Sequence, residues 1–353
     1  MIGTIYSSKQ FSKMTKRFEH IDAFRGLCIF AVVYGHIILF CGLKQYPRSA
    51  IETFFSDYFL VGFYFISGFL GYKNNMLQNA VELGQYVWKK THTLLIPSIA
   101  VMATYCIIVK GDIRVLWSPW NMWVTWFTYV LFSITFIYGV FTYLFRKTGK
   151  KHMCCSLLFV TALLSYTLAR QKIEIGGGIC LGKVLYYYPY FVLGVLCRAY
   201  QPLFEKFMAS KILLPIVALL YAAYHYIAQL PLFVCSICSI LLVYGVVYRL
   251  YENTDSVNIP FNVHILSVLS TLGRYSLEIY FVHFVLLFNL PASIVNYLTS
   301  LGTDTCWWGH SSLSFAEFVL LCPLTLILSY ASIYISHLIK QIPYFGQVFF
   351  GRK

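Results

Sequence analysis

Three ionisable residues in the first apolar stretch of the chain could do chemistry inside a membrane. The stretch runs from Ile21 to Leu43; Asp22 and Arg25 lie near its start, and His36 lies well inside it. A charged side chain in the middle of a membrane span costs roughly 2.5–3.5 kcal/mol, so such residues usually face a cavity and serve a function. These three residues are therefore the first candidates for a catalytic site.

The spacing places Arg25 and His36 on one face of a helix. They are eleven positions apart, which is roughly three turns plus 20° and about 16 Å along the axis. Asp22 precedes Arg25 by three positions and joins the same stripe. The pattern predicts a phosphate-bearing ligand at the guanidinium and proton transfer at the imidazole. The alternative is a snorkelling arginine and a hydrogen-bonded histidine in the core.

A second group of ionisable residues lies in the segment 272–283, LGRYSLEIYFVH. Arg274 and Glu278 are four positions apart and could pair on a helix. Glu278 is a candidate to bind the substrate, to orient His36 or to balance the charge of Arg25. The alternative is a self-contained Arg–Glu pair. His283 is offset from Glu278 by about 140°. We count it with Glu278 as a candidate substrate-binding residue.

A third group is basic and comes just before a predicted span. Lys89, Lys90 and His92 stand in the segment QYVWKKTHTLLIP. We expect a helix to start here, and the backbone N–H groups of a helix start also favour anions. The group is therefore a candidate to bind the phosphates of a cofactor, together with Arg25. The alternative is that these charges only set the orientation of the chain in the membrane.

The segment YFLVGFYFISGFLGY, residues 58–72, combines small residues with hydroxyl groups. Tyr64 and Ser67 are candidates to form hydrogen bonds with a substrate. Gly62, Ser67 and Gly68 would let neighbouring helices approach closely. Packing alone is the alternative explanation for the whole segment.

Composition predicts the setting in which these residues work. The 353-residue chain is 59% hydrophobic and only 11% charged, and its mean hydropathy is +0.69. Repeated apolar runs of about 20 residues are typical of a polytopic helical membrane protein. The net charge of +14 does not indicate nucleic-acid binding, because the lysines and arginines lie between the apolar runs. We see no cleavable signal peptide.

We expect an all-α fold, a membrane bundle of about ten transmembrane helices with both termini in the cytoplasm. The basic residues between the spans fall mostly on the cytoplasmic side in this arrangement. We expect one membrane domain over residues 1–353, with cytoplasmic tails at 1–20 and 338–353. The predicted spans are 21–42, 54–72, 94–110, 121–145, 153–169, 184–198, 212–229, 231–249, 271–296 and 314–337.

The cysteines show no strong metal-binding spacing. There are 11 of them, and most fall within predicted spans. Cys235 and Cys238 form a CxxC pair, but the pair lies inside the apolar run FVCSICSILLVYG. We interpret both as small hydrophobic residues of a helix, and we expect no metal.

These motifs together resemble the acyltransferase-three family of membrane O-acyltransferases, which includes fucose 4-O-acetylase-like and polysaccharide O-acetyltransferases. An arginine followed by a histidine after ten residues is the most specific match. Other matches are spread over most of the chain. They are Asp22 and Gly26 with Arg25 and His36; Phe65, Ser67 and Gly68; Lys89, Lys90 and Pro97; Trp126 and Phe127; Phe191 and Gly194; and Gly273, Ser276, Tyr280 and His283.

The resemblance implies an enzyme that moves an acyl group, usually acetyl from acetyl-CoA, onto a hydroxyl of a glycan or a lipid-linked sugar. By the same resemblance, Arg25 would help to hold the CoA end and His36 would be the catalytic histidine. General-base catalysis and a covalent acetyl-histidine are both open. Asp22 or Glu278 would orient a histidine. The expected location is the cytoplasmic membrane of a bacterium, in contact with lipid, and self-association is left open.

Two other classes of function remain as alternatives at this stage. A transporter or flippase for a glycan or lipid-linked sugar would use the same buried charges along a substrate path, but such proteins often contain internal repeats, and none is clear here. A purely structural partner in a polysaccharide assembly would not explain the stripe formed by Arg25 and His36. Release of CoA from acetyl-CoA would distinguish an enzyme from both.

Overall fold

The all-α class is confirmed over the part of the chain that the structure describes. A computed structural model describes residues 18–41, 43, 49–72, 77–107, 111–112, 125–145, 151–171, 181–226, 231–254, 260–303 and 317–351. Every regular element in these ranges is a helix. Residues 1–17 of the predicted tail 1–20 lie outside the described residues.

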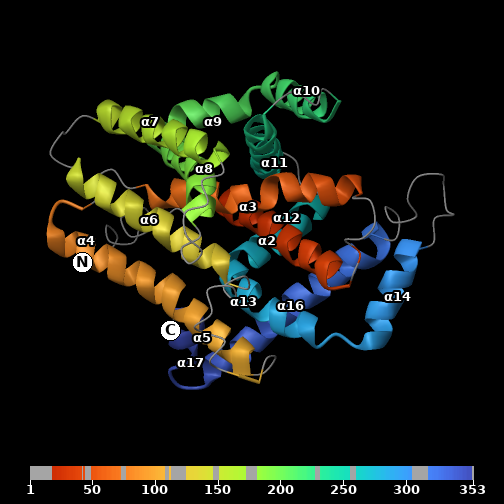
Figure 1. The fold of residues 1–353 in the computed structure, drawn as a ribbon. Helices are drawn as coiled ribbons and strands as arrows, with labels where there is room; N and C mark the ends of the chain where they lie inside the picture. Colours follow the sequence, from red (N-terminus) through yellow and green to blue (C-terminus); the bar gives the residue numbers. More distant parts are fainter. Residues whose placement is uncertain are drawn as a thin grey trace, which may run out of the picture.

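Figure 1 labels most of the helices. Their bounds are α2 Glu19–Phe40, α3 Ala50–Gly71, α4 Ala80–Lys90, η2 Thr91–Leu95, α5 Ile96–Tyr105, α6 Trp126–Leu144, α7 Lys151–Arg170, α8 Leu181–Ala199, α9 Gln201–Ala209, α10 Leu213–Tyr226, α11 Leu232–Thr254, α12 Pro260–Arg274, α13 Ser276–Phe288, α14 Ala292–Thr303, η7 Glu317–Leu321, α16 Cys322–Gln341 and α17 Phe345–Phe350.

Helix α2 lies at the centre of the bundle. It packs against α12, α3, α13, α16 and α11, and most of its side chains are buried. Figure 1 shows α2 and α3 crossing the middle of the molecule, with α13 and α16 on one side and α8 and α11 on the other. A helix that is apolar on all sides can be buried on all sides. The first apolar stretch therefore forms the core of the molecule.

Glycines allow two pairs of helices to touch through their backbones. A Cβ on Gly26 of α2 would overlap the carbonyl oxygen of Leu269 in α12, and one on Gly273 would overlap the carbonyl oxygen of Asp22. The α3–α8 crossing is built in the same way from Gly68 and Gly194. Small residues let membrane helices approach closely. The predicted packing role of Gly68 is thus confirmed.

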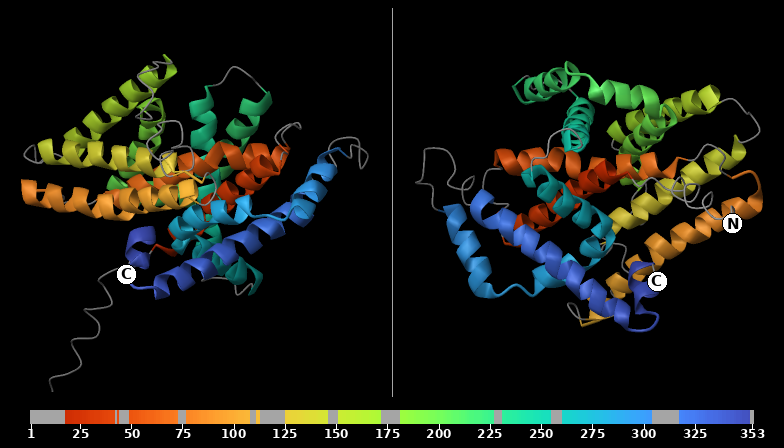
Figure 2. Two further views of the ribbon diagram at one scale, coloured as in Figure 1. Left: turned by 60° about the horizontal axis from the view of Figure 1, so that its bottom comes forward. Right: turned by 180° about the vertical axis from the view of Figure 1, so that it is seen from behind.

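The remaining helices surround this centre, as Figure 2 shows from two further directions. Helix α4 packs along α6, α7 along α8, and α10 along α11. Helix α17 packs against α5 and α16, and its Phe350 is buried. The predicted tail 338–353 therefore contains the last turn of α16 and a further packed helix.

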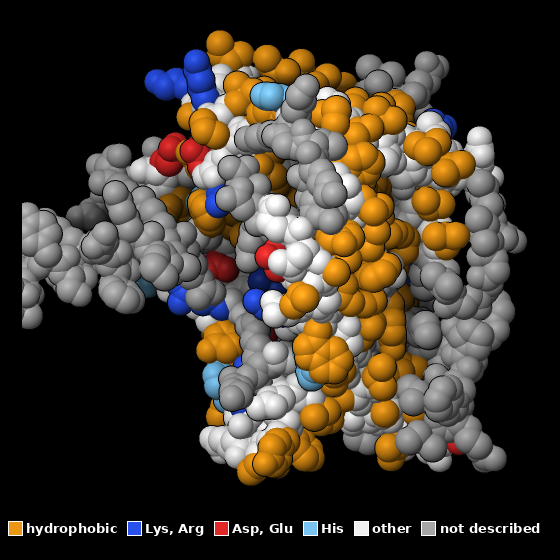
Figure 3. All heavy atoms as spheres, turned by 90° about the vertical axis from the view of Figure 1, so that its left-hand side faces the viewer, with side chains coloured by type: hydrophobic (Ala, Val, Ile, Leu, Met, Phe, Trp, Pro, Cys, Tyr) orange, Lys and Arg blue, Asp and Glu red, His pale blue; other side chains and the backbone are white. Residues whose placement is uncertain are grey.

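Six helices are long and apolar enough to cross a membrane, among the described residues. The count rises to eight if two bent pairs each form one span: α9 with α10, bent by 81°, and α13 with α14, bent by 91°. A broad band of hydrophobic side chains covers the face in Figure 3, with lysine and arginine side chains beside it. The chain is a multi-pass membrane protein. The count of ten spans and the cytoplasmic placement of both termini stay predictions.

The predicted span 271–296 is divided into three helices. Helix α12 ends at Arg274, α13 begins at Ser276, and α14 follows after the bend. Because α12 ends before Glu278, Arg274 and Glu278 do not share a helix and take different partners. Arg274 forms an ion pair with Asp22 at 3.9 Å, and Glu278 accepts a hydrogen bond from Lys340 at 2.9 Å.

Candidate active site

A cavity of about 380 Å³ lies between α2, α3, α4, η2, α6 and α13. A volume of this order is typical of sites for small organic ligands. Most of its lining is apolar, and a few cationic and polar groups project into it. The lining residues that carry charge or a hydrogen-bonding side chain are Arg25, His36, Ser67, Lys89, Lys90, Thr93, Trp126, Thr135, Ser276 and Tyr280.

Arg25 lies toward one end of this cavity and His36 toward the other. Helices α2 and α3 run antiparallel, since Phe24 contacts Phe65 and Tyr34 contacts Phe55. Arg25 near the start of α2 is therefore level with the last turns of α3, where Ser67 lines the same space.

His36 is three helical turns further along α2. The one-face prediction holds for Arg25 and His36, because both residues line a single cavity. Lys89 and Lys90 line it as well, so the cavity joins three cationic side chains to one imidazole.

His283 is the side chain that contacts the ring of His36. Its Nε2 lies 3.0 Å from Nδ1 of His36, and its own Nδ1 lies 2.8 Å from the carbonyl oxygen of Ile279. A carbonyl only accepts hydrogen bonds, so Nδ1 of His283 carries a proton. In a neutral His283, Nε2 is then an acceptor, and His36 donates to it from Nδ1. This arrangement leaves the lone pair of His36 on Nε2.

Packing holds the two imidazoles in place. His283 is completely buried, and the ring of Phe284 lies 4.6 Å from that of His36, between ring centroids. His283 and Phe284 both come from the second half of α13, and this helix packs against α2. His283 thus faces His36 while Glu278 of the same helix faces Lys340, which agrees with the offset of about 140° between the two positions.

Asp22, Tyr64, Glu278 and His283 are not among the residues that line the cavity. Asp22 faces Arg274 on α12. Tyr64 is buried, stacks on Tyr187 at 4.5 Å and donates a hydrogen bond to the carbonyl of Phe127. These contacts differ from the substrate-binding role predicted for Tyr64, and they make it part of the packing behind the cavity wall.

Glu278 is also directed away from the cavity. It is 1% exposed and forms its ion pair with Lys340 of α16. An unpaired charge at this depth would be strongly destabilising. The contact therefore fixes α13 against α16. The ring next to His36 belongs to His283, so neither Asp22 nor Glu278 takes the orienting place that the sequence suggested.

The basic group on α4 is placed differently from the prediction. Lys89 and Lys90 end α4, and the chain continues without interruption through the π-helical turn η2 into α5. The expected helix start is therefore wrong here, because the backbone N–H groups are already used within the continuous helix. The lysines reach the cavity through their side chains. His92 packs instead against Trp88 at 4.5 Å and is not a lining residue.

Comparison with known proteins agrees with this geometry. A family model of the acyltransferase-three family, described as an acyltransferase domain, matches residues 18–334. The chain belongs to this family. No curated protein and no solved structure matches the chain. The match covers every helix that lines the cavity.

In this acyltransferase, several lining residues were noted in the sequence only as family motifs. Trp126 and Phe127 begin α6 and line the cavity, and so do Ser276 and Tyr280 of α13. Ser276 Oγ is buried and has no hydrogen-bond partner among the described residues. Ser276 and Tyr280 are four positions apart and therefore lie on one face of a helix, and this spacing could have identified them as site residues from the sequence. The apolar Phe284 completes the wall beside His36.

Proposed function

We propose that this acyltransferase transfers an acyl group, acetyl in the first instance, from cytoplasmic acyl-CoA to a hydroxyl of a glycan or a lipid-linked sugar. In this proposal Arg25, Lys89 and Lys90 bind the phosphate-bearing end of the donor. His36 acts at the thioester. The single observation that carries the proposal is the cavity that contains all four side chains.

The size of the cavity suggests that one part of acyl-CoA binds inside it and the other part at its mouth. A volume of about 380 Å³ suits a drug-sized ligand, which corresponds to the pantetheine arm and its acyl group better than to the whole of CoA. The nucleotide would then lie at the mouth, where Lys89 is exposed to solvent. Arginine pairs with phosphate oxygens through its planar fork, and lysine adds positive charge.

The tautomer of His36 supports its role as a general base. With Nδ1–H donated to His283, Nε2 is the basic atom. It takes the proton from the acceptor hydroxyl as that oxygen attacks the thioester carbonyl. When the C–S bond breaks, the imidazolium returns the proton to the sulfur and CoA leaves as a thiol. General-base assistance of this kind contributes roughly 10²–10⁴-fold.

His283 would stabilise the charged form of His36 during this step. Its Nε2 keeps accepting from Nδ1 of His36, and its Nδ1–H stays bonded to the carbonyl of Ile279. A neutral ring in this place orients the base without taking the proton itself. The apolar wall, with Ile29, Val32 and Leu131, limits access of water that would hydrolyse the thioester.

The same geometry also suits transfer through a covalent acetyl-histidine. In that route Nε2 of His36 attacks the thioester directly, and the acceptor hydroxyl then removes the acetyl group. The two routes differ in kinetics, because only the covalent route gives ping-pong behaviour and an acetylated protein without acceptor.

The test of the proposal is release of CoA from acetyl-CoA by the purified protein, with and without a glycan acceptor. We expect His36→Ala to abolish acceptor-dependent release while the protein keeps its elution volume in detergent. His264→Ala is the control, since His264 is exposed on α12 and is not a lining residue. Full activity in His36→Ala would exclude the catalytic role. A transporter would release no CoA in any variant.

A further inference from the structure

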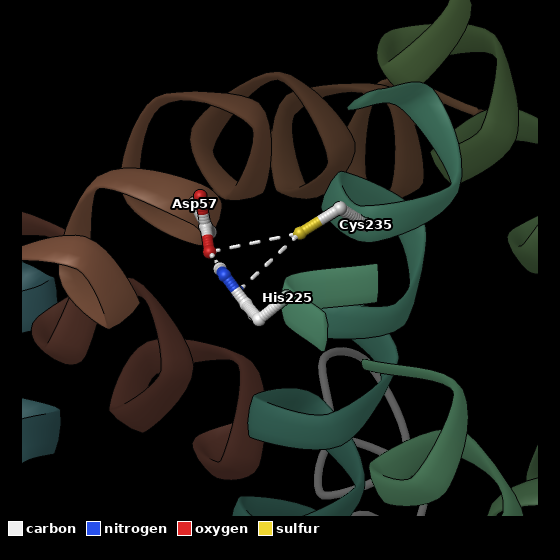
Figure 4. Close-up of side chains that lie close together, drawn as sticks. All are labelled: Asp57, His225 and Cys235. Atoms are coloured by element: carbon white, nitrogen blue, oxygen red, sulfur yellow. Dashed lines mark hydrogen bonds and ion pairs between the residues drawn. The ribbon is translucent and has the colours of Figure 1, made fainter. Parts of the chain in front are cut away.

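A second group of chemically active side chains lies outside the acyl-transfer cavity. Asp57 of α3, His225 of α10 and Cys235 of α11 point toward a common centre, as Figure 4 shows. Asp57 Oδ2 is 3.2 Å from Nε2 of His225 and 3.6 Å from Sγ of Cys235. The sulfur and Nε2 of His225 are 4.0 Å apart. Three different helices therefore place one oxygen, one nitrogen and one sulfur around one point.

These three separations are close to those between the ligands of a tetrahedral zinc ion. Bonds of about 2.3 Å to sulfur and about 2.0–2.2 Å to nitrogen and oxygen set sulfur about 3.6 Å from either lighter atom, and nitrogen about 3.4 Å from oxygen. The ligand types also agree. A thiolate, an imidazole and a carboxylate together favour zinc over calcium or magnesium, which take oxygen ligands.

The charge of the group favours a cation as well. Asp57 lies within a helix that is apolar enough to span a membrane, where an ionised carboxylate is costly unless it is compensated. A thiolate, a carboxylate and a neutral imidazole carry two negative charges, which a divalent ion cancels. Binding of the ion would release the thiol proton of Cys235 to solvent.

Neighbouring contacts hold the carboxylate of Asp57 in position. Tyr221 of α10 donates a hydrogen bond of 2.7 Å to the same Oδ2 atom, and Ser239 of α11 donates to the backbone carbonyl of Asp57. Outer hydrogen bonds of this kind orient metal ligands. The side chain of Cys235 is buried, whereas that of His225 is 34% exposed, so an ion could enter past the histidine.

We propose that Asp57, His225 and Cys235 bind one zinc ion, which ties the α10–α11 hairpin to α3. The fourth ligand is water, as in zinc sites with three protein ligands. Phe59 and Leu60 follow Asp57 on α3 and line the acyl-transfer cavity. The ion therefore fixes the helix that forms one wall of the site, although the zinc site itself does not depend on the proposed reaction.

The test uses cobalt as a spectroscopic substitute for zinc. The purified full chain in detergent is stripped with a chelator and titrated with Co²⁺. We expect one equivalent to give the visible absorption of tetrahedral cobalt and a thiolate-to-cobalt band in the near ultraviolet, both removed by added Zn²⁺. A wild-type protein that gives neither band would overturn the proposal.

Variants assign the ion to this cluster. Cys235→Ser should lose the thiolate band, and His225→Ala should lose tetrahedral binding with little effect on folding, because that ring is partly exposed. Cys238→Ser is the matched control: Cys238 is a free buried thiol one turn further along α11, and its variant should keep both bands.

Thermal unfolding gives a second readout. Zn²⁺ should raise the Tm of the stripped wild type and of Cys238→Ser, and it should leave that of His225→Ala and Asp57→Asn unchanged. A bare Asp–His pair, the competing explanation for the cluster, predicts no zinc-dependent shift in any of these proteins. Equal loss of the cobalt bands in Cys235→Ser and Cys238→Ser would also overturn the assignment.

Discussion

His283 offers the sharpest test at the scale of single residues. His283→Ala removes the acceptor for Nδ1–H of His36, so the catalytic ring loses its fixed tautomer. We expect kcat to fall about 10–100-fold, the usual effect of removing an orienting partner, while KM for acyl-CoA changes little. His283→Gln should recover part of the loss, because its amide oxygen can accept the same hydrogen bond. The measurement is steady-state kinetics, and an unchanged kcat in His283→Ala would remove His283 from the mechanism.

The lysines of α4 should act on the nucleotide end of the donor. An exposed ion pair contributes up to about 1 kcal/mol, so Lys89→Ala is expected to raise KM for acetyl-CoA about fivefold with kcat retained. Acetyl-pantetheine lacks the phosphates, and its KM should not respond. His92→Ala is the matched control, because His92 packs on Trp88 outside the cavity. A larger effect of His92→Ala than of Lys89→Ala would favour the arrangement first expected from sequence.

Sequence spacing identified individual residues of the site but not their partners. The ten-residue interval predicted that Arg25 and His36 share a face, because the geometry of one helix determines it. His283 lies 247 positions from His36, and Asp57 lies 168 positions from His225. No periodicity reports which helices become neighbours, so the orienting imidazole and the zinc ligands became visible only in the structure.

At the scale of helices, the α2–α12 crossing should be the most sensitive contact. A methyl group added at Gly26 meets the backbone of α12, and overpacking typically costs about 1–3 kcal/mol. Gly26→Ala should therefore lower the Tm. Gly35 lies on the same helix and has nothing within 4 Å of its added Cβ. Gly35→Ala should leave the Tm unchanged or raise it, since alanine restricts the unfolded chain.

Thermal unfolding in detergent compares these two variants directly. The comparison controls for helix propensity, because both substitutions exchange glycine for alanine within α2. Equal Tm values for the two variants would contradict the close α2–α12 contact.

Hydropathy predicted where helices lie better than where they break. The spans at 21–42, 54–72 and 231–249 correspond closely to α2, α3 and α11. The break at Tyr275 falls inside the predicted span 271–296, and the π-helical turn at Thr91–Leu95 falls at the start of the predicted span 94–110. Tertiary contacts explain one of them, since the break lets Arg274 reach Asp22 and Glu278 reach Lys340. Such contacts are not encoded in local composition.

At the scale of the whole molecule, the proposed function requires acyl-CoA to reach the cavity from one side of the membrane only. Arg25 lines the cavity near the start of α2, level with the end of α3, and His36 lies further along α2. The excess of basic residues between the predicted spans predicts that the start of α2 lies on the cytoplasmic side. Acyl-CoA is too highly charged to cross a bilayer unaided. In the proposed function it therefore enters the cavity from the cytoplasm, where Arg25, Lys89 and Lys90 bind its phosphates.

Sealed membrane vesicles of opposite orientation test this asymmetry. Inside-out vesicles should release CoA from externally added acetyl-CoA without treatment, because their cytoplasmic face is outward. Right-side-out vesicles should do so only after permeabilisation, and His36→Ala vesicles should do so in neither state. Activity in intact right-side-out vesicles would show that the bundle has the opposite orientation to the one predicted. That result would not affect the role proposed for His36, because His36→Ala vesicles would still be inactive. The experiment therefore tests the orientation of the chain separately from its chemistry.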